Sequence, residues 1–171
     1  MLIYHPAFDA NHCLYRLLTI LMGIKGNSVS WERLRVLDFF YLFPSHLKKI
    51  NPWPVPIRAY KSKLNNIPDQ FEDISNPARI FFDLKEFQRS AILELVAKGI
   101  IDRADFENGL ITLNKSLLPD DFINFVMNDE FVNSDAYEVI SNALPSIEFN
   151  GASGLKNRSG LMEYRYDVPQ K

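Results

Sequence analysis

The sequence predicts a mostly α-helical α+β fold with a winged-helix-like domain, a β-hairpin wing and an extended C-terminal tail. Two observations lead to this prediction. Apolar residues recur at helical spacing behind capping residues. One such helix is followed by a glycine, a short β-favouring segment, a turn and a second β-favouring segment. At 171 residues, with 47% hydrophobic and 23% charged residues, the chain has the size and composition of one domain.

Two helices are expected near the N-terminus. The first covers residues 9–24, where Asp9 is a plausible N-cap and leucines recur on one face. The second follows Ser30 and is apolar on more than one side, which predicts that it is buried. Its aromatic residues Phe39, Phe40 and Phe43 exceed what one helix face can bury, so we expect a partner protein to complete this part of the core.

A proline-containing insert is expected over residues 44–75. Pro44 ends the preceding helix or opens a short one through Ile50. Prolines at three alternate positions, 52, 54 and 56, then forbid a helix interior and predict an extended connector with Trp53 as an anchor. A further short helix is expected over residues 57–64, followed by a polar loop.

The wing of the predicted fold follows the most regular helix, which spans residues 84–98 and closes at Gly99. Asn76 and Pro77 form the cap and first turn of the helical region leading into it. Residues 100–101 and 110–113 favour strands, and Asn108-Gly109 between them is typical of a hairpin turn.

The body of the domain is expected to cover residues 1–149, with helices opening at Pro119 and Ser134. Residues 150–171 are expected to form a flexible or extended tail that begins with a glycine-rich turn cluster. This tail either folds back on its own domain or docks on a partner. Its candidate partner-binding residues are Leu161, Met162, Tyr164, Arg165 and Tyr166.

The net charge of −2 argues against a general nucleic-acid coat, and it conceals two oppositely charged segments. Residues 102–138 carry nine acidic and two basic residues, so a wing in this segment would repel DNA phosphates. These charges favour a scaffold that binds protein over sequence-specific DNA recognition. The insert instead carries a basic patch with no acidic residue between positions 44 and 64. The patch is a nucleic-acid surface, a site for an acidic partner or a solvated face, and it comprises Lys48, Lys49, Arg58, Lys61 and Lys63.

Residues suited to catalysis or metal binding are few. His5, Asp9, His12 and Cys13 are close in sequence, but they match no known zinc spacing. Asp9 is better explained as a helix cap, and Cys13 as a small core residue. The chain has no glycine-rich phosphate loop and no serine-hydrolase or zinc-protease motif. We therefore expect a protein that is not an enzyme, with no catalytic residue, metal or cofactor.

The chain is expected to be cytoplasmic and without membrane association. It shows neither a secretory signal nor the roughly 20 apolar residues that a bilayer-spanning helix requires.

Three segments resemble a known prokaryotic family: residues 4–18, residues 33–44 and residues 160–167. They are similar to the middle component of ABC-three-component conflict systems, the group that includes Lamassu-type defence. The resemblance implies a non-catalytic subunit that bridges an SMC/Rad50-like coiled-coil ATPase and a separate effector, often a nuclease. The effector would stay inactive until phage or plasmid DNA is sensed, and DNA would be reached through the complex. The alternative is a winged-helix DNA-binding transcriptional regulator.

Overall fold

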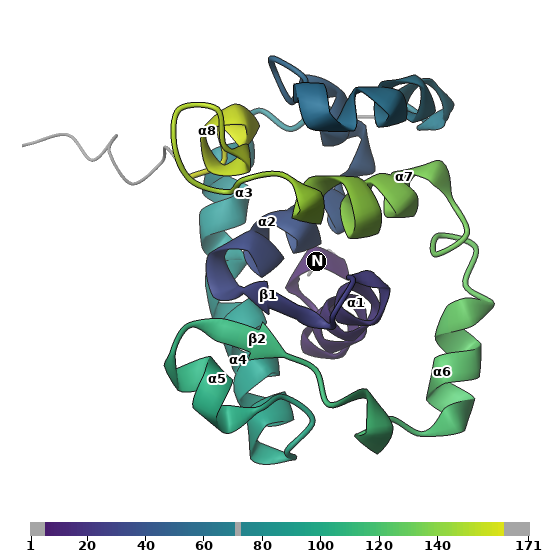
Figure 1. Ribbon diagram of the computed structural model, residues 1–171, viewed down its shortest axis with the longest axis vertical. Helices are drawn as coiled ribbons and strands as arrows, with labels where there is room; N and C mark the ends of the chain where they lie inside the picture. Colours follow the sequence, from purple (N-terminus) through teal and green to yellow (C-terminus); the bar gives the residue numbers. More distant parts are fainter. Residues whose placement is uncertain (1–5, 71–72, 163–171) are drawn as a thin grey trace, which may run out of the picture.

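The computed structural model describes residues 6–70 and 73–162, and it is mostly helical with one small antiparallel sheet (Figure 1). The predicted α+β, mostly α class is therefore confirmed. In chain order the elements are η1 (Pro6–Phe8), α1 (Ala10–Gly23), β1 (Ser28–Ser30), α2 (Trp31–Leu42), η2 (Pro44–Lys49), η3 (Val55–Asn66), α3 (Pro77–Asp83), α4 (Lys85–Ala97), α5 (Arg103–Glu107), β2 (Leu110–Thr112), η4 (Lys115–Leu117), α6 (Asp120–Met127), α7 (Asp135–Glu138), η5 (Val139–Ala143), η6 (Leu144–Ser146) and α8 (Leu155–Ser159).

Side-chain caps determine where several helices begin. Asp9, Ser30, Asn76 and Ser134 each accept a hydrogen bond from the backbone N–H three residues further along the chain. Each cap satisfies a donor that the first helical turn leaves without a partner. These four predicted helix starts are confirmed.

The sheet does not form as a two-residue hairpin. β2 pairs antiparallel with β1, with Val29 opposite Ile111, and an isolated bridge joins Ile101 to Leu113. Between residues 101 and 110 the chain forms α5, because the carboxylate of Asp102 accepts a hydrogen bond from the N–H of Asp105 and caps a helical turn. The predicted hairpin turn at Asn108-Gly109 was wrong, since these residues end α5.

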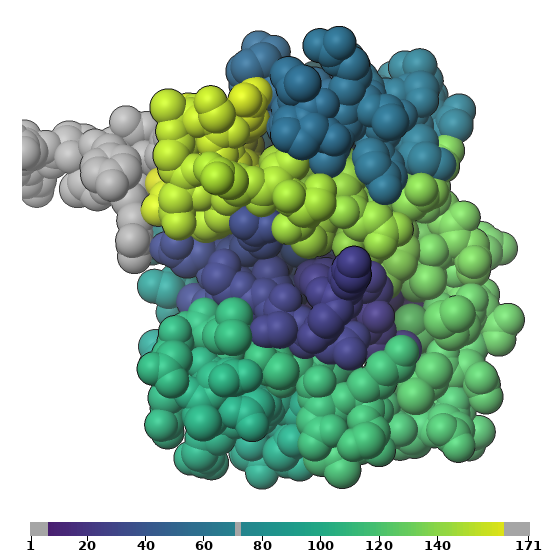
Figure 2. All heavy atoms as spheres, in the orientation of Figure 1, coloured from purple at the N-terminus to yellow at the C-terminus, as the bar shows by residue number. Residues whose placement is uncertain are grey.

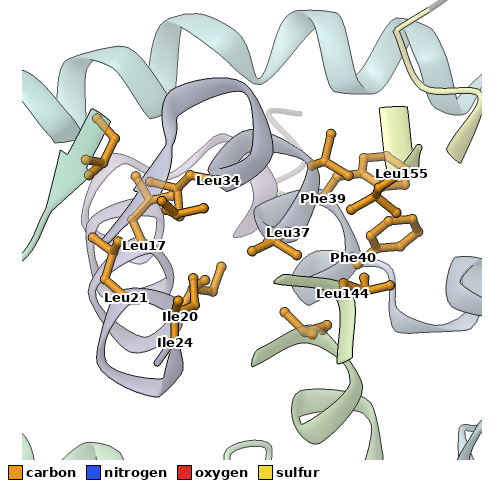
Figure 3. Packing of buried hydrophobic residues seen from close by; sticks show 14 of the residues in the cluster. Leu17, Ile20, Leu21, Ile24, Leu34, Leu37, Phe39, Phe40, Leu144 and Leu155 are labelled. Carbon is orange, nitrogen blue, oxygen red and sulfur yellow. The ribbon is translucent and has the colours of Figure 1, made fainter. Parts of the chain in front are cut away.

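The core surrounds α1, which packs against both α2 and α4. Leu17 of α1 faces Leu34 of α2, and at the other end of α2 the rings of Phe39 and Phe40 lie beside Leu155 and Leu144 (Figure 3). All of these side chains are at most 1% exposed.

The aromatic residues of α2 are buried by this chain itself. Phe43 is also buried, with its ring centroid 5.0 Å from that of Phe39. The ring of Phe81 from α3 meets Phe39 edge-on at 6.3 Å. The expectation that a partner covers Phe39, Phe40 and Phe43 was therefore wrong, because α3 and α8 supply the missing contacts.

The insert forms the two short helices that were expected in it, η2 and η3. The indole N–H of Trp53 donates to the carbonyl of Ile57 at 3.0 Å, which anchors the connector between them. η3 then packs against α7 and η5, so the insert covers one end of the molecule (blue in Figure 2).

The segment from residue 150 to residue 162 folds onto the body. Leu155 of α8 is fully buried against α2, and its N–H donates to the carbonyl of Glu148 at 2.9 Å. Gly154 lacks the Cβ that would lie 2.3 Å from the carbonyl oxygen of Asn150, so the chain can turn tightly there. The predicted flexible tail was wrong for residues 150–162, because the preceding turn returns this segment to the core.

Gly23 of α1 lies against the side chain of Tyr137 from α7. A Cβ at this position would lie 2.2 Å from the Oη atom of Tyr137. Tyr137 cannot move away easily, because it is buried and its hydroxyl donates to the carbonyl of Thr19 at 2.7 Å. We expect Gly23→Ala to lower the free energy of unfolding by about 1–3 kcal/mol, although alanine is the better helix former.

Urea denaturation of the purified variants measures this effect. Tyr137→Phe removes the atom that the new methyl group would meet first, so the double variant Gly23→Ala/Tyr137→Phe should lose less than the two single losses added together. A Gly23→Ala chain as stable as wild type would contradict the close approach.

Candidate functional site

A polar network lies inside the core where α1, α2 and α4 meet. Arg16, Asp38 and Gln88 come from these three helices, and all are fully buried. The Nε atom of Arg16 donates to Oδ1 of Asp38 at 2.7 Å, and its Nη2 atom donates to Oδ2 at 3.1 Å. The amide of Gln88 donates to the same Oδ2 at 2.8 Å. Burial lowers the pKa of Arg16, but the charge and hydrogen bonds of Asp38 outweigh that effect and raise it above its ordinary value.

Arg35 extends the network to α3. Its Nε atom donates to the side-chain oxygen of Gln88 at 3.0 Å, and its Nη2 atom donates to the carbonyl of Phe81 at 3.1 Å. The guanidinium also lies 4.3 Å from the centre of the Phe81 ring. These buried groups hydrogen-bond to one another, so the arrangement fixes how four helices meet and does not present a reactive group to solvent.

Sequence reasoning missed this network. The signal that could have found it is a charged residue on a helix that is otherwise apolar on several sides, as Arg16 and Asp38 are. Such residues are almost never fully buried unless they are paired, so each one predicts a partner.

The residues that suggested chemistry have structural roles. Burial, with a further contribution from the Asp38 carboxylate, raises the pKa of Cys13 to about 12, so the thiolate needed for attack is not populated at neutral pH. Asp9 caps α1, and the Nδ1 atom of His12 lies 2.8 Å from Nη1 of Arg16. Within residues 6–70 and 73–162, no three His, Cys, Asp or Glu side chains gather to hold a metal ion. His5 lies outside the described residues.

The basic patch of the insert is partly paired with carboxylates. Lys48 lies 2.7 Å from Asp69, and Lys49 lies 3.7 Å from Asp73. Exposed pairs of this kind contribute little to stability, so a phosphate could displace the carboxylates. Arg58 and Lys61 of η3 are exposed, and Lys61 lines a shallow hollow together with Lys48. A nucleic-acid role for the patch stays a prediction.

The acidic and basic segments meet at Lys63. Its ammonium group lies 2.8 Å from Asp135 and 2.8 Å from Glu138, both in the acidic segment. The hydrogen bond from Lys63 lowers the pKa of Asp135. Part of the near-neutral total charge is therefore a local cancellation between η3 and α7.

Two hollows adjoin at the C-terminal end of α1. The first has a volume of about 470 Å³ and is lined by Lys25, Arg33, Asn142 and several serines. The second has a volume of about 390 Å³ and is lined in part by Met22 and Met127. Ser141 and Asn142 line both, so the two hollows lie next to each other at this end of the helix, and we call them together the α1 groove.

The helix α6 also exposes apolar side chains. Phe125 is 66% exposed and Met127 is 62% exposed. α6 is held to α1 through Tyr15, whose ring meets Phe122 edge-on at 6.1 Å and whose hydroxyl donates to Asp129 at 2.6 Å. Exposed apolar side chains on an acidic segment are a candidate contact surface for another protein.

One comparison decides the family. The family model described as ABC-three component (ABC-3C) system Middle Component 5 matches residues 2–167. The chain belongs to this family. The predicted identification as a middle component is confirmed, and a Middle Component 5 chain is by that description one part of a multi-protein system. Comparisons with curated proteins and with solved structures found no significant match.

The predicted partner-binding tail of this Middle Component 5 chain is only partly described. Leu161 is 3% exposed and Met162 packs against the core, so neither is presented to a partner in this arrangement. Tyr164, Arg165 and Tyr166 lie outside the described residues. Within the described ranges, no helix is both long and apolar enough to cross a membrane.

His46 introduces a pH dependence into the stability of the chain. Its ring is 4% exposed and lies edge-on to Phe39 at 5.6 Å, and neither ring nitrogen has a hydrogen-bond partner among the described residues. Burial, aided by the nearby charge of Lys49 and opposed by Asp73, lowers the pKa of His46 below its ordinary value. The unfolded chain therefore binds this proton more readily than the folded chain.

We expect the free energy of unfolding to fall as the pH drops below about 6.5, and the loss from this group to level off below the folded-state pKa. Urea denaturation of wild type and His46→Leu between neutral and mildly acidic pH measures this contribution. The variant should show the shallower pH dependence, because it lacks the titrating ring. If the free energy of unfolding of the two proteins changed in the same way with pH, His46 would not be the source of the pH dependence.

Proposed function

We propose that this chain is a non-catalytic accessory subunit that bridges an SMC/Rad50-like coiled-coil ATPase and an effector of the nuclease class. The complex would act in the cytoplasm as a Lamassu-type antiphage or antiplasmid system. Membership of the Middle Component 5 family over residues 2–167 is the observation that carries this proposal.

The chemistry of the described residues supports a role in binding. The buried polar network is enclosed and internally hydrogen-bonded, and Cys13 is held as a neutral thiol. The surface instead offers features that suit protein contacts, namely the α1 groove and the exposed apolar residues of α6.

A winged-helix-like interpretation of the core is part of the proposal. The chain runs from α1 through β1 to α2, and β2 follows α4 and pairs with β1. The segment in the place of the wing carries Asp102, Asp105 and Glu107, which favours docking on a protein over contact with DNA phosphates.

Co-expression with the two proteins expected to complete the system tests the function. A tag on this chain should recover a complex of defined stoichiometry by size-exclusion chromatography with light scattering. The chain alone should show little salt-sensitive DNA binding in a shift assay. Assembly of the other two proteins into an active complex without this chain would refute the bridging role.

Part of the tail remains a proposed contact with the ATPase. Because residues 155–162 belong to the folded body, the informative truncation removes residues 163–171, including Tyr164, Arg165 and Tyr166. We propose that this truncation weakens co-purification with the ATPase, and urea denaturation of the isolated truncated chain measures any effect on folding separately.

A DNA-binding regulator is the second candidate. The observation that favours it is the exposure of Arg58 and Lys61, which form no ion pair among the described residues. Charge reversal at Lys48, Lys49 and Lys61 should abolish any salt-sensitive DNA binding by the chain. If the charge-reversed variant bound DNA as well as wild type does, the basic patch would not be the DNA-binding surface.

A further inference from the structure

The α1 groove has a cationic end with no carboxylate among its lining residues. Lys25 and Arg33 line this end, and neither forms an ion pair within residues 6–70 and 73–162. Elsewhere on the described surface, Lys63 and Lys98 lie beside carboxylates, whereas Arg58 and Lys61 are unpaired like the two cations of the groove. On a chain with a net charge of −2, two cations facing one hollow leave a place for a negative group from outside.

Arg33 is oriented before any ligand arrives. One Nη1–H donates to the carbonyl of Pro145, and the guanidinium lies 5.5 Å from the centre of the Phe149 ring. These contacts leave other N–H groups of the guanidinium available. The side chain is half-buried, which lowers its pKa and makes an anionic partner more valuable than it would be in open solvent. A planar guanidinium group held in this way can donate two parallel hydrogen bonds to a carboxylate.

The other end of the α1 groove combines polar side chains with a few apolar ones. Met22, Val126 and Met127 line it, and Met127 is 62% exposed. Glu138 also lines this end, but its carboxylate is held by Lys63 at 2.8 Å. In Figure 2 the purple residues of α1 reach the surface in the middle of the view, between the yellow-green segment and the green segment.

We propose that the α1 groove binds a peptide segment of a partner protein in which an acidic side chain lies close to an apolar one. The carboxylate contacts Arg33 and Lys25, and the apolar side chain lies beside Met22 and Met127. This inference rests on the proposed function in one respect, namely that the partner is another component of the same complex.

Charge and shape favour a peptide over two other anions. A nucleic acid would extend beyond the cationic end, past β1 and β2 towards α5, where Asp102, Asp105 and Glu107 would repel its phosphates. A small free anion would make no contact with Met22 and Met127 at the other end. A short peptide uses both ends, and methionine side chains adapt readily to an apolar partner.

The direct test is an NMR titration of the ¹⁵N-labelled full chain with the blocked peptide Gly-Glu-Gly-Leu-Gly. We expect shifts at the backbone amides of residues 24–33 and 141–146, and about tenfold weaker binding when glutamine replaces glutamate in the peptide. The protein variant Lys25→Gln/Arg33→Gln should lose binding to a similar extent. Lys98→Gln, which removes an exposed lysine outside the groove, should bind as wild type does.

A second variant, Lys25→Glu, distinguishes a loss of peptide binding from a loss of folding. Lys25 is exposed, and its side chain forms no hydrogen bond or ion pair with another described residue that Lys25→Glu would break. This variant should therefore keep the wild-type urea curve and still weaken peptide binding. The absence of shifts at these amides, or equal binding by Lys25→Glu and wild type, overturns the proposal. Inorganic phosphate binding at the same amides as tightly as the peptide also overturns it, in favour of a general anion site.

Co-purification with the other components tests the identity of the partner. Lys25→Glu should reduce the fraction of chain recovered in the complex, and Lys98→Gln should not. If wild type forms no complex, the proposed function fails. The peptide titration still shows whether the α1 groove binds a peptide. If wild type and Lys25→Glu assemble equally well, the groove is not the docking site for those components.

Discussion

Replacing Asp38 by asparagine should lower the free energy of unfolding by about 3–5 kcal/mol. The side chain keeps its size, but the buried guanidinium of Arg16 loses the negative partner that its Nε and Nη2 atoms contact. Gln88 would also face an amide where it now donates to a carboxylate. Because small domains are stable by only about 5–15 kcal/mol, the variant should unfold at a much lower urea concentration.

A double-mutant cycle separates the ion pair from the rest of the network. Arg16→Met leaves a buried carboxylate without its cation and should be similarly destabilising, whereas Arg16→Met/Asp38→Asn removes both charges and should lose less than the two single losses added together. Asp121→Asn, at an exposed position of α6, is the matched control and should change little. A loss below about 1 kcal/mol for Asp38→Asn would contradict the buried pair.

Local signals predicted much of the fold. Asp9, Ser30, Asn76 and Ser134 are caps whose effect depends on the next three residues, so the sequence contains the information needed to place these helix starts. The hairpin prediction failed because it weighed the Asn108-Gly109 turn without the competing cap at Asp102.

Contacts between distant segments could not be predicted in this way. Paired residues of β1 and β2 are 80 or more positions apart in the chain, and each strand is only three residues long. A strand of that length has too few alternating side chains to show a period. The partners of Asp38 come from two other helices, so no local pattern reveals the buried network.

The surface was predicted less well than the helices. The sequence showed that five basic residues lie in the insert, but it did not show that one of them, Lys63, lies beside Asp135. The α1 groove brings Lys25 and Arg33 together with Asn142, from three elements or their ends, and nothing in the spacing of these residues indicates that they meet. Tertiary packing alone brings these groups together.

Leu155→Ala is expected to lower the free energy of unfolding by about 2–5 kcal/mol, because it removes a fully buried side chain and leaves a cavity. Leu155 lies beside Phe39 in Figure 3 and packs against α2, so few atoms can move to fill the space. Gly154 and the hydrogen bond from the Leu155 N–H to Glu148 hold α8 in place and limit its collapse.

Leu117→Ala is the matched control, because it is the same substitution at a leucine that is 51% exposed, and it should cost much less. Urea denaturation of both variants decides between two descriptions of the C-terminal segment. If residues 150–162 formed a detachable tail, the two leucines would be equally dispensable for stability. If α8 completes the core around Phe39, Leu155→Ala loses stability and Leu117→Ala does not, and a truncation intended to probe partner binding must begin after residue 162.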